Sequence, residues 1–222
     1  MKRSFLVIGL GRFGISLART LTKEGHSVLG IDSSETVIQK FSFEIDNVMK
    51  LDATDSEVLD SLGIGEFEAV IICIGEKYIQ NSILATLLAK EKGAKKIIAK
   101  AGTKVQGKVL SKVGADMVVF PEKDMGERVG KILSSNNVID YIELSSNITI
   151  LELKTPELMA GKDLIELNLR RKYGVTIISV KDSEGNVKTP PDVNYKFKQE
   201  DIVTLIGENK LLKKLHLAEF CK

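Results

Sequence analysis

The sequence predicts an α/β fold, with a doubly wound parallel sheet in the first part of the chain and a smaller α+β module behind it. Short runs rich in Val, Ile and Leu alternate with longer amphipathic stretches through the first 120 residues. The runs are continuously apolar, as in strands covered on both faces, which is typical of a parallel sheet. Beyond residue 136 the strands alternate apolar and polar residues, which favours antiparallel pairing.

The first part of the chain contains the repeated strand and helix pattern of a doubly wound domain. Strands are expected at 4–9, 27–32, 47–51, 69–74, 96–100 and 117–120. Helices are expected at 11–23, 34–43, 56–62, 78–92 and 104–113. Six such units favour the strand order 3-2-1-4-5-6, with helices on both faces of the sheet.

The second part follows a break in the pattern. A helix is expected at 124–134, and the polar segment 135–137 interrupts it as a hinge, so the domains are predicted as 1–136 and 137–222. The second domain should contain strands at 141–144, 149–153, 175–181 and 202–206. A loop with a short helix is expected at 158–169, a turn at 182–186 and a last helix at 209–216.

Composition excludes several classes of protein. The net charge of +2 is small and the basic residues are dispersed, which argues against nucleic-acid binding. All apolar runs are shorter than the roughly 20 residues that are needed to span a bilayer. The first apolar run is interrupted by glycines and Arg12, which argues against a signal peptide. Cys73 lies in an expected buried strand and Cys221 near the end, so neither a disulfide framework nor a zinc cluster is expected. These features predict a cytoplasmic protein.

A glycine pattern at residues 9–14 points to a nucleotide. It follows an expected strand and opens an expected helix, and Asp32 ends the second strand, which together form the Rossmann fingerprint. Gly9 permits the tight turn, Gly11 lets the backbone approach phosphate, and Gly14 allows close helix packing. Phosphate would bind the free amides of the helix start. Asp32 would accept hydrogen bonds from ribose hydroxyls, which tells against a 2′-phosphate.

Further residues follow strands on the same edge of the sheet. Arg12 is expected either to reach a terminal phosphate, in its own or a neighbouring subunit, or to be a surface arginine. Asp52 is expected either to face the adenine or to cap the helix that begins near Asp55. Lys100 is expected to point at phosphate or to be solvated. The predicted cofactor-binding set also includes Phe13, Ala53, Ile74 and Gly75.

The residues argue against hydride-transfer chemistry, which needs an acid or base beside the nicotinamide. His26 precedes the second strand, on the wrong edge of the sheet, and His216 lies near the end of the last helix. The second domain has no Ser/His/Asp or Cys/His set. We therefore expect the protein not to be an enzyme. The alternatives are an NAD-dependent oxidoreductase that uses a lysine or tyrosine base, and a free-standing nucleotide sensor.

Several motifs together resemble the RCK (TrkA) family of potassium-transport regulators, and within it the Ktr type with one Rossmann unit per chain. They lie at residues 9–14, 32, 52–54, 114–116, 121–126 and 167–174, so the resemblance covers nearly the whole chain. It implies a non-enzymatic subunit made of TrkA-N and TrkA-C domains. Homodimers would assemble into an octameric ring beneath a membrane potassium-translocating subunit of the KtrB or TrkH kind, at the inner face of the cell membrane.

The same resemblance implies ligands. ATP or ADP, and in some relatives NAD or NADH, would bind the Rossmann cleft. Arg12 would contact the γ-phosphate across the dimer and distinguish ATP from ADP. Glu122 would hold Mg²⁺ or Ca²⁺ near the phosphates, or else act as an acid at a helix N-terminus. Many relatives have glycine where this chain has Leu51, which puts the adenine contact of Asp52 in doubt.

The resemblance also implies a second ligand, cyclic di-AMP, at a dimer interface of the C-terminal domain. Arg170 would pair with its phosphate and the apolar residues would pack on its bases. A plain dimer-core role is the alternative. The corresponding positions are Leu164, Leu169, Arg170, Thr176, Pro190 and Pro191.

Overall fold

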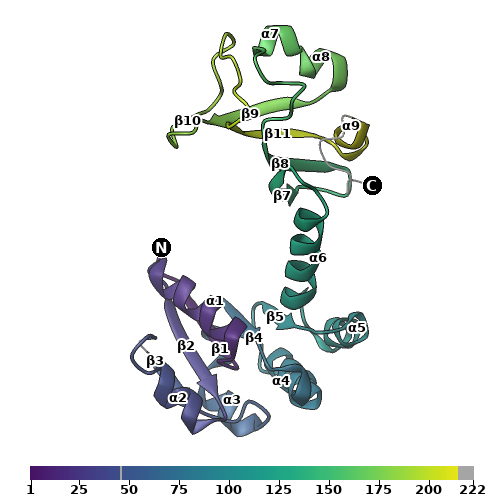
Figure 1. Ribbon diagram of the computed structural model, residues 1–222. Helices are drawn as coiled ribbons and strands as arrows, with labels where there is room; N and C mark the ends of the chain where they lie inside the picture. The colour runs from purple at the N-terminus through teal and green to yellow at the C-terminus, as the bar shows by residue number, and fades with distance from the viewer. Residues whose placement is uncertain (46, 215–222) are drawn as a thin grey trace. The chain divides into compact units, whose positions relative to one another are not determined.

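A computed structural model describes residues 1–45 and 47–214, which form two compact units, Met1–Asp124 and Met125–Lys222. The first unit contains a six-stranded parallel sheet and the second a five-stranded antiparallel sheet (Figure 1). Both sheet types are those expected from the sequence. No helix in the described ranges is both long and apolar enough to cross a membrane.

The sheet of the first unit has the order β3-β2-β1-β4-β5-β6, which confirms the predicted order. Its register fixes which strand ends lie together. Ile8 of β1 pairs with Ile72 of β4, and Ile72 pairs with Ala99 of β5. The residues that follow these positions therefore share the carboxyl edge of the sheet. The strands are β1 (Ser4–Ile8), β2 (Ser27–Asp32), β3 (Asn47–Lys50), β4 (Ala69–Ile72), β5 (Ile97–Lys100) and β6 (Met117–Val119).

Helices cover both faces of this sheet, because successive residues of a strand point to opposite sides. Val7 of β1 packs in one core cluster with residues of α1 (Arg12–Lys23) and α2 (Glu35–Phe41). Its neighbours Leu6 and Ile8 belong to a second cluster on the other face. That cluster includes residues of α3 (Ser56–Ser61), α4 (Ile79–Glu91) and α5 (Lys104–Val113), and two short 3₁₀ helices, η1 (Ile64–Glu66) and η2 (Glu76–Tyr78), complete the unit.

Helix α6 (Pro121–Leu133) begins three residues before the predicted start at residue 124. The sequence prediction left Pro121 outside the helix. Proline is instead well suited to the first position of a helix, since its missing N–H has no partner there in any case. The earlier start brings Glu122 and Asp124 into the first turn of the helix, where acidic side chains are stabilised by the helix dipole.

The second unit has the strand order β10-β9-β11-β8-β7, and its pairs are antiparallel, as predicted. Its strands are β7 (Val138–Glu143), β8 (Ile148–Lys154), β9 (Thr176–Lys181), β10 (Val187–Lys188) and β11 (Ile202–Glu208). Its short helices are α7 (Leu164–Leu167), α8 (Leu169–Tyr173) and α9 (Asn209–Lys214). Strand β10 and helix α8 were not predicted. The last two residues of the predicted helix 209–216 lie outside the described residues, as does Cys221.

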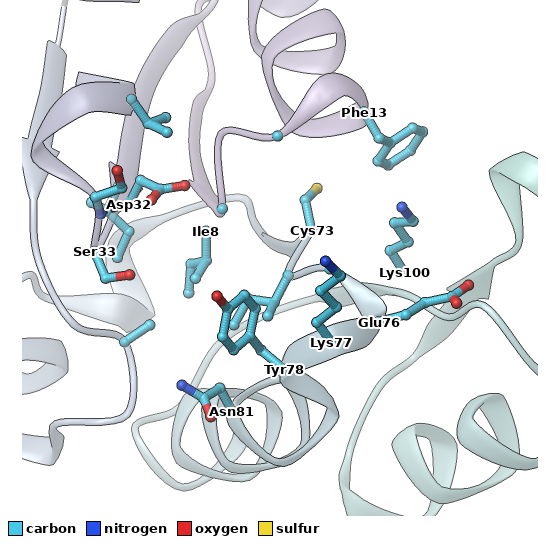
Figure 2. Close-up of a pocket in the computed structure, with 18 of the residues that line it drawn as sticks. Ile8, Phe13, Asp32, Ser33, Cys73, Glu76, Lys77, Tyr78, Asn81 and Lys100 are labelled. Carbon is cyan, nitrogen blue, oxygen red and sulfur yellow. Dashed lines mark hydrogen bonds between the residues drawn. The ribbon is translucent and has the colours of Figure 1, made fainter. Parts of the chain in front are cut away.

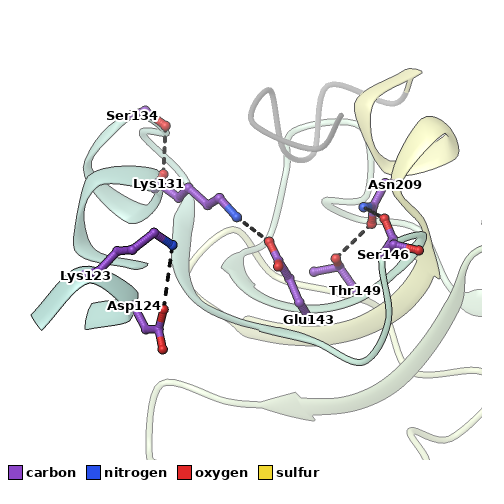
Figure 3. A network of polar contacts seen from close by, with 8 residues as sticks. All are labelled: Lys123, Asp124, Lys131, Ser134, Glu143, Ser146, Thr149 and Asn209. Atoms are coloured by element: carbon purple, nitrogen blue, oxygen red, sulfur yellow. Dashed lines mark hydrogen bonds and ion pairs between the residues drawn. The ribbon is translucent and has the colours of Figure 1, made fainter. Parts of the chain in front are cut away.

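Ion pairs tie the later turns of α6 to β7 within the second unit. The guanidinium of Arg128 donates to both carboxylate oxygens of Asp140, with Nε 3.0 Å from Oδ1. One turn further on, Lys131 donates to Glu143 (Figure 3). Figure 3 also shows Thr149 of β8 donating to Asn209 at 2.8 Å, which joins the sheet to the start of α9.

Candidate nucleotide-binding site

A cavity of about 760 Å³ lies at the carboxyl edge of the parallel sheet, within the first unit (Figure 2). This volume lies within the range of roughly 300–1,000 Å³ typical of small-molecule sites. Of the predicted cofactor-binding residues, all but Gly14 line it. They are Gly9, Gly11, Arg12, Phe13, Asp32, Asp52, Ala53, Ile74, Gly75, Lys100 and Glu122.

The three glycines of the turn have different surroundings. Gly9 has a φ of 92°, and a Cβ there would lie 3.1 Å from the backbone of Cys73 and Ile74. A Cβ on Gly14 would lie 2.0 Å from the carbonyl oxygen of Gly9, so α1 packs too closely on the turn for any side chain. A Cβ on Gly11 would meet nothing within 4 Å, which leaves its face open toward the cavity.

The start of α1 has the features of an anion site. Its N-cap is Gly11, which has no side chain to accept hydrogen bonds from the first amides, and its first turn contains no acidic residue. The first amides of a helix have no acceptor within the helix, and the helix dipole favours negative charge beside them. Because Gly11 and Arg12 also line the cavity, a phosphate group fits this position.

Asp32 stabilises the glycine turn that forms part of the cavity wall. Its Oδ2 accepts the N–H of Leu10 at 2.8 Å, and its Oδ1 accepts the N–H of Ser34 at 2.9 Å. A carboxylate has about four acceptor positions, so lone pairs remain for ribose hydroxyls. Figure 2 shows Asp32 and Ser33 together on one wall of the cavity.

Asp52 is a turn residue and not a helix cap. Its Oδ1 accepts both the N–H of Thr54 at 2.9 Å and the hydroxyl of Thr54 at 2.7 Å, and these hydrogen bonds lower the pKa of Asp52. The cap of α3 is Asp55, which accepts from Glu57 and Val58, so the capping interpretation of Asp52 is wrong. Leu51 lines the cavity beside it and also packs on the core.

Lys100 and Glu122 form an ion pair at the opposite end of the cavity, with Nζ 2.5 Å from Oε1. The Lys100 side chain is only 12% exposed, so the interpretation of a solvated lysine is wrong. The hydrogen bond from Lys100 lowers the pKa of Glu122, and the nearby Arg12 guanidinium adds a smaller effect in the same direction. Glu122 therefore combines two roles, as a partner of Lys100 and as an acid in the first turn of α6.

The cavity includes side chains that the sequence prediction did not assign to it. The most notable are those of η2, which follows Gly75, together with Asn81 at the start of α4; Figure 2 shows Lys77 and Tyr78 pointing toward the cavity. The general rule that ligands lie outside the carboxyl ends of parallel strands would have included this loop. The other members, besides Leu51, are Ile8, Ile31, Ser33, Ser34, Val37, Thr54 and Cys73.

Cys73 lies deep in the cavity wall as a free thiol, 5% exposed. Burial raises its pKa to about 12, because the thiolate would be poorly solvated there. A protonated, buried thiol is a poor nucleophile. Cys73 is accordingly a wall residue.

His26 does not supply a base to the cavity. His26 lies before β2, where its ring contacts Phe5 at a centroid distance of 5.4 Å and its Nδ1 lies 3.5 Å from the backbone nitrogen of Arg3. It is not among the residues that line the cavity. His216 lies outside the described residues.

The residues predicted for a second ligand lie in the second unit and differ in burial. Leu169 is 5% exposed and Leu164 packs beside it in the core cluster of this unit. Leu169 is therefore a core residue of the single chain, and Leu164 is partly buried against that core. Pro191 is buried and follows Pro190, which has a cis peptide bond to Thr189. The exposed members are Arg170, Thr176 and Pro190.

Comparison with known proteins agrees with this architecture. The model of the TrkA-N domain matches residues 5–121, and that of the TrkA-C domain matches residues 148–217. The chain belongs to the RCK/TrkA family. The Ktr system potassium uptake proteins C and A of Bacillus subtilis are 42% and 39% identical to it, and the alignments cover 93% and 96% of this chain and 93% and 95% of those proteins.

Solved structures show the same fold for this RCK/TrkA chain. The GsuK channel matches all of the chain with a TM-score of 0.71 at 22% identity, and this chain spans 39% of that channel subunit. The GsuK channel bound to NAD matches 98% of the chain with a TM-score of 0.70 at 23% identity, over 39% of the channel subunit. At this level of identity the likeness concerns the fold.

Proposed function

We propose that this RCK/TrkA chain is a non-enzymatic regulatory subunit of a potassium uptake system, controlled by an adenine nucleotide in the cavity of the first unit. One observation carries the proposal. A single cavity brings together the glycine turn, Asp32 and two cations, Arg12 and Lys100, in a chain with close relatives named as Ktr potassium uptake proteins.

The nucleotide would lie along the carboxyl edge of the sheet. Its ribose would meet Asp32, and its phosphates would lie over Gly11 and the first amides of α1, toward Arg12 and Lys100. The adenine would lie near Asp52 and Ala53. ATP and ADP are the favoured ligands, with NAD or NADH as alternatives, in keeping with GsuK structures described as bound to NAD and to ADP.

Regulation would follow from differential binding. A ligand shifts a conformational equilibrium only by its difference in affinity for the two states. The γ-phosphate of ATP would add a charge-assisted contact to Arg12, in the same subunit or across a homodimer, worth about 1–3 kcal/mol per site. Repeated around an octameric ring, this difference would bias the whole assembly. The ring would act on a KtrB- or TrkH-like membrane subunit from the cytoplasmic face. The boundary between the two functional domains of each chain would lie near residue 136.

Glu122 is the residue of the cavity predicted to hold a divalent cation. Among the described residues, no group of three or more His, Cys, Asp or Glu side chains is arranged to hold a metal. Glu122 offers one carboxylate, so Mg²⁺ or Ca²⁺ would take its remaining oxygen ligands from the nucleotide phosphates, from waters or from a second subunit. In the second unit, the exposed Arg170 is the residue that the family resemblance assigns to a cyclic di-AMP phosphate.

Calorimetric titration of the full chain tests this proposal, with ATP, ADP, NADH and cyclic di-AMP as ligands and the assembly size measured in each state. We expect ATP and ADP to bind and to give different assemblies. Gly11→Ala is the matched variant, because a Cβ there meets nothing within 4 Å, and it should fold but bind these nucleotides more weakly. Failure of every adenine nucleotide to bind would overturn the proposal, and turnover of NADH would favour the oxidoreductase instead.

A further inference from the structure

The Lys100–Glu122 pair occupies the end of the cavity where the phosphates of a nucleotide would lie. Lys100 is the last residue of β5, and the residue before it is in register with Ile72 and, through Ile72, with Ile8. Lys100 therefore lies about two strand spacings, roughly 10 Å, from the glycine turn that follows Ile8. Figure 2 shows its ammonium directed into the cavity on the side of Phe13 in α1.

The two partners differ in their freedom to move. The Lys100 side chain is 12% exposed, whereas that of Glu122 is 55% exposed. A cation so little exposed must keep an anionic partner, because an unpaired charge there is costly. The Glu122 carboxylate can turn to water at little cost, and it remains in the first turn of α6, where the helix amides stabilise it.

We propose that Lys100 is a ligand of the nucleotide's phosphate tail and that Glu122 competes with that tail for the Lys100 ammonium. The inference rests on the proposed function, and it names the residue that makes binding depend on the charge of the tail. A longer, more negative tail displaces the Glu122 carboxylate more completely, and this removes the side-chain link between the end of β5 and the first turn of α6.

Competition follows from the number of charges at this end of the cavity. An ammonium has three donors, so both anions can touch Lys100 at once. A phosphate beside Glu122, however, places two negative charges within contact of one cation, and the two anions repel one another. Without a divalent cation to bridge them, the more mobile carboxylate leaves. Because Glu122 belongs to α6, the charge of the tail acts directly on the first turn of that helix.

A double-mutant cycle in nucleotide affinity tests this inference. The full-length wild type, Glu122→Gln, Lys100→Gln and the double variant are titrated calorimetrically with AMP, ADP and ATP in EDTA, with thermal melts to confirm folding. We expect Glu122→Gln to bind ATP about three- to tenfold more tightly, as for release of a partly exposed charge pair. The gain should be smaller for AMP, and most of it should vanish in the Lys100→Gln background.

Glu76→Gln is the matched control, since Glu76 also lines the cavity but is not paired with Lys100. It measures the general effect of removing one negative charge. The inference is overturned if Glu122→Gln weakens ATP or leaves it unchanged in EDTA. It is equally overturned if Glu76→Gln gives the same gain, or if the gain persists in the Lys100→Gln background. If the wild type binds no nucleotide at all, the proposed function fails first; if it binds and the cycle shows no coupling, only this inference fails.

Discussion

Asp32 accepts the backbone N–H of Leu10 at 2.8 Å, across 22 positions of sequence, so the end of β2 holds the glycine turn that follows β1. The other carboxylate oxygen accepts the N–H of Ser34 at 2.9 Å. One side chain therefore fixes two loops of the cavity and still has lone pairs directed to a ligand. A change at Asp32 should affect the shape of the site as well as its chemistry.

Asp32→Asn should lower nucleotide affinity at least about tenfold and the free energy of unfolding by about 1–2 kcal/mol. The amide keeps one acceptor oxygen but turns an N–H₂ group toward a backbone N–H. Calorimetry and chemical denaturation measure the two effects. Asp55→Ala is the control, because removing this N-cap should cost about 1 kcal/mol of stability and leave affinity unchanged. Wild-type affinity in Asp32→Asn would contradict the assigned role.

The glycines of the turn should separate folding from binding. Gly14→Ala should destabilise the chain by about 2 kcal/mol or more, because its Cβ would lie 2.0 Å from the Gly9 carbonyl oxygen and α1 would have to shift. Gly11→Ala should fold with nearly wild-type stability, since its Cβ meets nothing within 4 Å, but should bind ADP more weakly. Thermal melts and calorimetry test both. Equal stability of the two variants would contradict the close packing of α1 on the turn.

The Arg128–Asp140 pair should make the stability of the second unit sensitive to acid. The hydrogen bond from Arg128 lowers the pKa of Asp140 below its ordinary value of 3.8. A carboxylate with a lowered folded-state pKa stabilises the fold above its unfolded pKa, and this contribution is lost as the pH falls through the folded value. Asp140→Asn should therefore reduce the melting temperature at neutral pH and flatten its decline from about pH 5 downward. An unchanged acid profile would exclude the pair as a source of stability.

Arg170 and Arg171 provide a matched pair for the second ligand. Both are exposed on α8, but only Arg170 is predicted to contact cyclic di-AMP phosphate. Arg170→Ala should weaken cyclic di-AMP binding at least about tenfold, while Arg171→Ala should change it less than about twofold. Calorimetry with the dinucleotide measures both. Equal losses would indicate a general charge effect in place of a specific contact.

Much of the fold was predictable because the spacing of apolar residues along the sequence indicates which faces of a strand or helix are buried. Continuous apolar runs such as 69–74 identified strands covered on both faces, and the glycine turn with Asp32 located the edge where the cavity lies. Side-chain pairings were not predictable. Lys100 and Glu122 are 22 positions apart, and no local pattern indicates that the end of β5 meets the start of α6.

Short secondary-structure elements were also not predictable from the sequence. Strand β10 has two residues and helix α8 has five, too few for a period to be recognised. Helix α8 is separated from α7 only by Asn168, in the left-handed conformation at φ 45°. The start of α6 was placed too late because proline is favourable at the first position of a helix and disruptive further in.

Ion flux shows whether ATP and ADP in this cavity set the activity of a potassium-translocating membrane subunit. The protein would be reconstituted in liposomes with its KtrB-type partner, and rubidium uptake measured in saturating ATP or ADP. We predict different fluxes in the two nucleotides for the wild type, and no difference for Arg12→Ala, which should still bind ADP normally. Equal flux in ATP and ADP with the wild type, at concentrations where both are bound, would contradict the account.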